Sequence, residues 1–109
     1  MEDVRHLVGE RIQILRKQKE LSQEDLASRI GIDTKSLSRL ERGQHYPSLE
    51  TLERIRAELD VKLKDFFDFD GSPSADEMRN FLVRTASKAD YSALLKMVDA
   101  VKAVIQKTP

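Results

Sequence analysis

The chain lacks cysteine altogether and has no long apolar run among its 109 residues. Without cysteine, disulfides, thiolate zinc sites and cysteine nucleophiles are excluded. No apolar run approaches the roughly 20 residues that cross a membrane as a helix. The first ten residues, MEDVRHLVGE, also lack the apolar core of a signal peptide. We therefore expect a cytoplasmic protein with no membrane segment.

An excess of charge of either sign is absent as well. The chain has 19 basic and 19 acidic residues, so its formal net charge is zero. Residues 1–70 hold 13 basic and 15 acidic side chains, which gives −2, and residues 71–109 hold 6 and 4, which gives +2. Domains that bind nucleic acid are often basic overall. Any attraction for nucleic acid must therefore come from a local arrangement of cations.

The motifs of common enzyme classes are missing too. There is no glycine-rich phosphate loop, no G-x-S-x-G and no H-E-x-x-H. The two histidines, His6 and His45, have no neighbours at metal-ligand spacing. The carboxylates alternate with lysines and arginines, which is typical of solvated helix surfaces. We predict a protein that is not an enzyme and that holds no metal and no cofactor.

What is present is helical periodicity along the whole chain. Apolar residues recur at three- and four-residue spacing over residues 4–15, and again over residues 52–59 after a capping position at Ser48. Residues 63–67 predict a short fifth helix that closes a core. No strand alternation is sustained, so the sequence predicts an all-α fold. Gly9 lies inside the first helix. Two interpretations of this glycine remain open, a tolerated surface position and close packing against a neighbouring element.

Residues 21–43, LSQEDLASRIGIDTKSLSRLERG, predict two short helices joined by a tight turn. Ser22 is expected to cap the first helix by accepting a backbone N–H, with Asp25 at the third helical position, and Asp33 is expected to cap the second. Gly31 between them suits the left-handed conformation that ends a helix.

The second of these helices, residues 33–42, has two different sides. At about 100° per residue, Leu37 and Leu40 face inward. The opposite side carries Lys35, Ser38, Arg39 and Arg42, with Thr34 at the leading edge. Lysine and arginine can reach guanine edges or phosphates, and a threonine methyl can meet a thymine methyl. Periodicity alone leaves two interpretations open, a solvated charged face and a DNA-reading face.

The spacing also resembles a known family. Ala27 lies four residues after Gln23, Gly31 eight after, Leu37 fourteen after and Leu40 seventeen after. Together with the segments LRKQKELSQEDLA, LSRLERGQHYPSLETLERI and ELDVKLKDFF, this closely resembles the helix-turn-helix of the Cro and phage-repressor (XRE) family over about residues 8–69. The resemblance implies a five-helix lambda-repressor-like DNA-binding domain. It also implies a sequence-specific transcriptional regulator, expected to be a repressor, that reads the major groove of double-stranded DNA with helix 33–42.

The same resemblance implies roles for individual residues. The positions expected to meet base edges are Thr34, Lys35 and Arg39. Those expected to contact DNA phosphates are Gln23, Ser22, Ser36, Ser38, Arg42 and Gln44, with backbone N–H groups around Gln44 and His45 contributing. Those expected to support the recognition helix are Arg16, Glu41, Ala27, Gly31 and Leu37, with Arg16 and Glu41 paired. The best-known phage members often carry glutamines at the base-reading positions, so base preferences cannot be transferred to this chain.

Residues 70–74 form the one clear linker and divide the chain into a DNA-binding domain, 1–69, and a C-terminal helical segment, 75–109. Ser74 and Glu77 predict a capping box for one helix, and Asp90 caps another that runs to about Gln106. The side of the last helix expected to mediate dimerisation carries Tyr91, Leu94, Leu95, Val98, Val101 and Ile105.

Two accounts of this segment are open. The helices either complete the core of their own domain or pair with a second chain. We favour pairing, because a short glycine-proline linker separates them from a compact unit. A homodimer would present two recognition helices to half-sites about 34 Å apart in a palindromic operator. An alternative function is that of an antitoxin or protein-interaction module that binds a different protein through its C-terminal helices.

Overall fold

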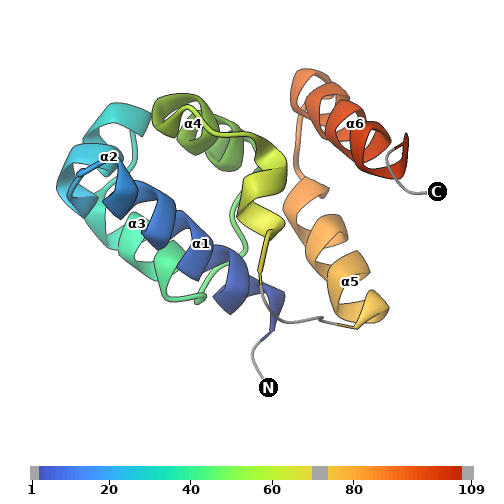
Figure 1. The fold of residues 1–109 in the computed structure, drawn as a ribbon, viewed down its shortest axis with the longest axis horizontal. Coiled ribbons are helices and arrows are strands. Elements are labelled where there is room, and N and C mark those ends of the chain that lie inside the picture. Colours follow the sequence, from blue (N-terminus) through green and yellow to red (C-terminus); the bar gives the residue numbers. More distant parts are fainter. Residues whose placement is uncertain (1–2, 70–73, 107–109) are drawn as a thin grey trace.

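The computed structural model describes residues 3–69 and 74–106, with side chains described through Lys102. The elements are α1 (Val4–Gln18), α2 (Gln23–Ile30), α3 (Thr34–Glu41), α4 (Leu49–Leu59), the 3-10 helix η1 (Leu63–Phe67), α5 (Ala75–Ala86) and α6 (Tyr91–Gln106) (Figure 1). No strand occurs within these described ranges, so the all-α prediction is confirmed. The expected fifth helix forms as a single tight 3-10 segment.

Helix starts follow from local capping. The side chains of Ser22, Ser48, Ser74 and Asp90 each accept a hydrogen bond, 2.8–3.1 Å long, from the backbone N–H three residues later. These bonds satisfy donors that the first helical turn leaves free. At Ser22 the capping box is complete, because Asp25 accepts from the Ser22 backbone N–H at 3.2 Å. At Ser74 only the serine half of the predicted box forms among the described residues.

The core is built around α1, which packs against α3, α4, η1 and α5. Val8, Ile12, Leu26, Leu52 and Phe66 are all at most 1% exposed. Each fully buried side chain of this size stabilises the fold by about 1.5–3 kcal/mol. The core therefore holds α2 and α3 in place from their inner sides.

Gly9 marks the closest approach in this core. A Cβ at Gly9 would overlap the Leu40 carbonyl oxygen and lie 2.7 Å from the Glu41 carbonyl oxygen. The backbones of α1 and α3 therefore touch at the end of α3. Of the two interpretations left open for Gly9, close packing is the one that the structure shows.

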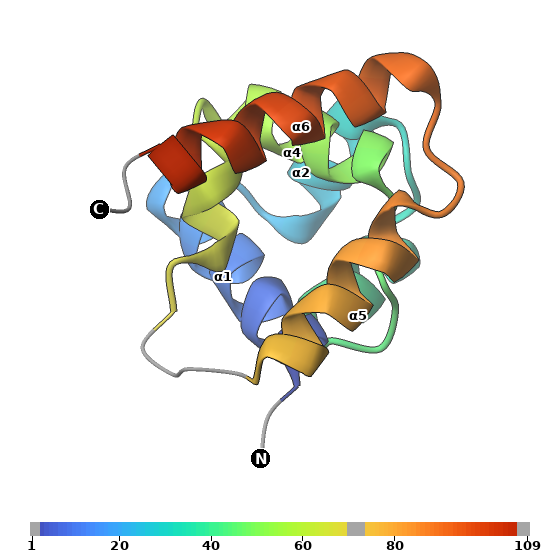
Figure 2. The same cartoon turned by 90° about the vertical axis from the view of Figure 1, so that its right-hand side faces the viewer.

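The two C-terminal helices cover one side of the N-terminal helices (Figure 2). Phe81 of α5 is 1% exposed, and its ring centroid lies 5.8 Å from that of Tyr46 and 5.6 Å from that of Phe67. Helix α6 lies against α4 and η1, with Ala93 buried. Both helices thus contact the core of their own chain, as expected by the account in which they complete the core of their own domain. The division into residues 1–69 and 75–109 stays a prediction.

Candidate nucleic-acid interface

The turn between α2 and α3 has the geometry that the sequence predicts. Gly31 ends α2 in the left-handed conformation, with φ of 77°, and the Ile32 N–H donates to the Ala27 carbonyl at 3.0 Å. The Asp33 side chain then caps α3 by accepting from the Ser36 N–H at 2.7 Å. Residues 31–33 therefore form a short, hydrogen-bonded connection that fixes the angle between the two helices.

Helix α3 is anchored through its buried side. Leu37 is fully buried, and Glu41 forms two hydrogen bonds with Arg16 of α1, at 2.7 and 2.9 Å. The side chains of Arg16 and Glu41 are only 7% and 2% exposed. Arg16 also donates to the Leu21 carbonyl, just before α2, at 2.8 Å. One buried ion pair therefore joins α1, the start of α2 and the end of α3.

Gln23 adds a contact that the sequence does not reveal. Its side-chain N–H donates to a Glu41 carboxylate oxygen at 2.9 Å, so Gln23 helps to support α3. The amide nitrogen has a second N–H. The contact to a DNA phosphate that the resemblance implies for Gln23 therefore stays a prediction.

The outer flank of α3 faces solvent. Lys35, Arg39 and Arg42 are exposed, and Thr34, Ser36 and Ser38 are half-buried. We call this set of six residues the α3 flank. The one acidic side chain within α3, Glu41, is buried on the opposite side and paired with Arg16. The α3 flank is therefore locally cationic although the whole chain is neutral.

The end of α3 limits which backbone groups near Gln44 are free to donate. The Gln44 backbone N–H donates to the Arg39 carbonyl at 2.9 Å, and Gly43 is left-handed with φ of 74°. Because this N–H closes the helix, the predicted backbone contact to a phosphate falls to the His45 N–H, and it stays a prediction. The Gln44 side chain is exposed, so a contact through its amide stays a prediction.

A shallow hollow with a mixed polar and apolar lining adjoins Arg39 and includes residues that the sequence did not single out for binding. His45, Ser48 and Thr51 line it together with Ser36 and Arg39. The Ser48 hydroxyl lies 2.8 Å from the Thr51 hydroxyl at the start of α4. The sequence feature that could have indicated these residues is Ser48, the capping serine after Pro47, because the chain there brings the start of α4 back toward α3.

Two carboxylates at helix starts, Asp33 beside the turn and Asp25 at the far end of α2, have lowered pKa values. Hydrogen bonds from the backbone N–H of Ser36 lower the pKa of Asp33, with smaller contributions from Arg39 and Lys35. The backbone N–H of Ser22 likewise lowers the pKa of Asp25. Both groups complement the positive ends of their helices. The cations of the α3 flank must therefore outweigh one nearby anion, Asp33.

Neither a metal-binding cluster nor a membrane-spanning helix is found in the part of the chain that the structure describes. No group of three or more histidine, aspartate or glutamate side chains there is placed to hold a metal ion. None of the described helices is both long and apolar enough to cross a membrane.

Comparison with known proteins agrees with this geometry. The family model described as helix-turn-helix matches residues 12–66, half of the chain, including all of α2 and α3. The chain belongs to the helix-turn-helix family. The resemblance to the XRE group of DNA-binding transcriptional regulators is thereby confirmed.

Three relatives illustrate the membership. The HTH-type transcriptional regulator SlrR of Bacillus subtilis is 38% identical over 63 residues, which are 57% of this chain and 41% of that protein. The solved N-terminal DNA-binding domain of SinR from Bacillus subtilis is 35% identical and superposes with a TM-score of 0.56, over 62% of this chain and 99% of that one. A chain of the SinR protein/SinI protein complex is 25% identical with a TM-score of 0.55, over 92% of this chain and 99% of that one.

Proposed function

We propose that this regulator binds double-stranded DNA as a homodimer, inserts the α3 flank into the major groove, and represses transcription. The observation that carries the proposal is the placement of Lys35, Arg39 and Arg42. All three are exposed on one side of a helix that is anchored only through its other side. A major groove about 12 Å wide admits such a helix.

The α3 flank and its surroundings divide into two kinds of contact. Thr34, Lys35 and Arg39 lie toward the start and middle of the helix, where a recognition helix reaches base edges. The residues assigned to phosphates are Ser22, Gln23, Ser36, Ser38, Arg42 and Gln44. Phosphate contacts set the position of the protein, whereas base contacts select the sequence. The hollow beside Arg39 brings the hydroxyl groups of Ser48 and Thr51, at the start of α4, next to the α3 flank.

Dimerisation through α6 is supported by its exposed apolar side. Tyr91, Leu94, Leu95, Val98 and Val101 are between 39% and 75% exposed. We call these five residues the α6 stripe; the side chain of Ile105 lies outside the described residues. A soluble monomer seldom exposes a contiguous apolar patch of this kind without using it. A two-fold pair of α6 helices would bury the stripe and give the regulator two recognition helices.

The test of DNA binding is selection of bound sequences from a random pool at two salt concentrations. The proposal expects a palindromic site with half-sites one helical turn apart and a salt slope that counts neutralised phosphates. Arg39→Ala should then cost about 1–3 kcal/mol and relax one base position. The matched control is Arg29→Ala, which removes an exposed cation of α2 that is paired with Glu58. Equal losses in the two variants would contradict a reading role for Arg39.

The test of assembly is the molar mass in solution. Val98→Asp should convert a dimer to a monomer, because it places a charge at the centre of the α6 stripe. Val83→Asp is the matched control, since Val83 is 67% exposed on α5 and lies outside the stripe. A wild-type chain that is monomeric at micromolar concentration would reject the homodimer.

A second candidate function rests on the SinR–SinI structure, in which a chain alignable over 92% of this one forms a complex with another protein. By analogy, α5 and α6 would bind a different protein, as an antitoxin or other interaction module does. A monomeric chain that binds no selected DNA but co-purifies with a second protein would favour this function. A homodimer that shifts a palindromic DNA from its own promoter and lowers reporter expression there would favour the repressor.

A further inference from the structure

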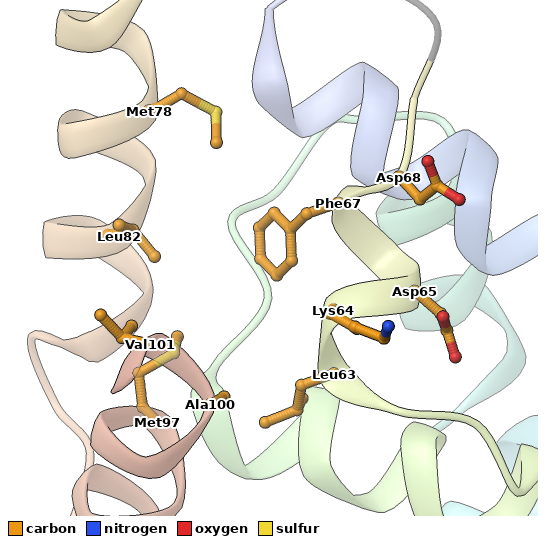
Figure 3. Close-up of a pocket in the computed structure, with 10 residues that line it drawn as sticks. All are labelled: Leu63, Lys64, Asp65, Phe67, Asp68, Met78, Leu82, Met97, Ala100 and Val101. Carbon is orange, nitrogen blue, oxygen red and sulfur yellow. The ribbon is translucent and has the colours of Figure 1, made fainter. Parts of the chain in front are cut away.

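A cavity of about 640 Å³ lies between η1, α5 and α6 (Figure 3). Its apolar lining consists of Leu63, Phe67, Met78, Leu82, Met97, Ala100 and Val101. These elements lie on the opposite side of the molecule from α2 and α3 (Figure 1). The size falls within the range of about 300–1,000 Å³ that is typical of small-molecule sites.

The polar lining residues do not reach into the apolar space. In Figure 3 the charged ends of Lys64, Asp65 and Asp68 point away from the α5 side chains that line the opposite wall. The Asp65 carboxylate also accepts a hydrogen bond from the Lys62 backbone N–H at 2.8 Å, so it is held at the start of η1. A charged group placed among the apolar walls would lose hydration without gaining a partner. The chemistry of the cavity therefore selects an uncharged, apolar occupant.

Each wall of the cavity is held by contacts to the rest of the fold. Helix α5 is fixed by Phe81, which is buried in the core. The η1 segment is fixed by Arg11, which donates to the Asp65 carbonyl at 3.0 Å. Helix α6 is fixed to α4 by the Lys96–Glu53 ion pair at 3.4 Å. The Phe81 ring also lies 5.6 Å from the ring of Phe67, so the packing that holds α5 supports one lining side chain directly.

Two of the lining side chains are methionines. Met78 comes from α5 and Met97 from α6, and both are half-buried. Methionine is unbranched and polarisable, so it adapts its shape to apolar ligands of different outlines. We propose that this cavity binds an uncharged, predominantly aromatic or aliphatic small molecule. The proposal goes beyond DNA binding and does not depend on it.

The first test is a titration of the full chain with the uncharged fluorophore N-phenyl-1-naphthylamine. Leu82→Trp fills the cavity, whereas Val83→Trp puts the same side chain at the adjacent position, which is 67% exposed and does not line the cavity. We expect one saturable site per chain in the wild type and in Val83→Trp, and at least tenfold weaker binding in Leu82→Trp. Absence of saturation, or equal affinity in the two variants, would overturn the proposal.

A second measurement uses the wild-type chain and does not depend on how Leu82→Trp folds. The ¹³C-methyl resonances of Met78 and Met97, assigned with Met→Leu variants, should both shift and saturate at the same probe concentration as the fluorescence. Fluorescence enhancement without these shifts would place the probe elsewhere and overturn the proposal. The titration is made at one protein concentration, because Val101 belongs both to the α6 stripe and to the cavity lining, so dimerisation alone can shift Met97. Probe affinity that falls as the protein concentration rises would show that a second copy fills the cavity, and would overturn the proposal as well.

Discussion

Replacing Arg16 with methionine tests how the recognition helix is held. The substitution keeps an unbranched apolar stem but removes three hydrogen bonds, two to Glu41 at 2.7 and 2.9 Å and one to the Leu21 carbonyl at 2.8 Å. Glu41, with a side chain only 2% exposed, would then keep Gln23 as its one remaining side-chain partner among the described hydrogen bonds. Removing one partner of a buried ion pair typically costs about 3–5 kcal/mol, because the other charge is left unpaired.

That loss is large relative to the whole free energy of unfolding. A domain of this size is stable by about 5–15 kcal/mol. At roughly 4 °C per kcal/mol for a chain of this length, the thermal midpoint should fall by about 12–20 °C. Urea denaturation followed by circular dichroism at 222 nm gives the free energy, and a thermal scan gives the midpoint. DNA affinity measured well below the new midpoint should also fall, since α3 loses its tie to α1.

Two further variants make the result interpretable. Arg29→Met breaks the Arg29–Glu58 pair, whose side chains are 52% and 34% exposed, and should cost about 0–1 kcal/mol. The double variant Arg16→Met/Glu41→Leu removes both buried charges and should be more stable than Arg16→Met alone. A loss in Arg16→Met no greater than that in Arg29→Met would refute the reasoning. So would a double variant as unstable as the sum of its two single variants.

Three other substitutions follow from the structure. Gly9→Ala should lower the free energy of unfolding by about 1–3 kcal/mol, because the new methyl would overlap the Leu40 carbonyl and press on Glu41; unchanged urea stability would contradict the close contact. The hydrogen bond that lowers the pKa of Asp33 in the folded chain stabilises the fold fully at pH values above 3.8, the ordinary pKa of aspartate. This stabilisation is lost as the pH falls through the lowered pKa of the folded chain. When the free energy of unfolding is measured against pH, Asp33→Asn should lack this loss of stability in acid. A carboxyl resonance of Asp33 in the wild-type chain that titrates at or above pH 3.8 would contradict the reasoning. Thr85 is 3% exposed, and its hydroxyl has no hydrogen-bond partner among the described residues. Thr85→Val should therefore raise the free energy of unfolding by about 1 kcal/mol. A lower melting temperature of this variant would show that the hydroxyl does have a hydrogen-bond partner.

The features predictable from sequence are those that depend on residues close together in the chain. Ser22, Asp33, Ser48 and Asp90 each find their capping partner three residues later, so a short segment contains the whole interaction. The left-handed glycine at position 31 is equally local. The order of helices and the outward flank of α3 follow from these starts and from the apolar spacing.

The features that escaped prediction depend on neighbours far along the chain. The surroundings of Gly9 are set by carbonyls more than thirty residues away. The amide of Gln23 is oriented by Glu41, eighteen residues later. The narrow apolar stripe of α5 predicts burial but does not say that Phe81 lies between Tyr46 and Phe67. An apolar side chain specifies that it will be covered, but not by which element, because the hydrophobic effect is non-directional.

In the proposed mode of binding, the one-sided anchoring of α3 separates the origin of DNA preference from the origin of folding. Thr34, Lys35 and Arg39 contribute no described side-chain hydrogen bond or ion pair to the scaffold, whereas Leu37 and Glu41 are locked into it. A library randomised at the first three positions should therefore yield mostly folded members with altered operators. New binding specificities are accessible to this regulator by changing surface residues alone, without repacking its interior.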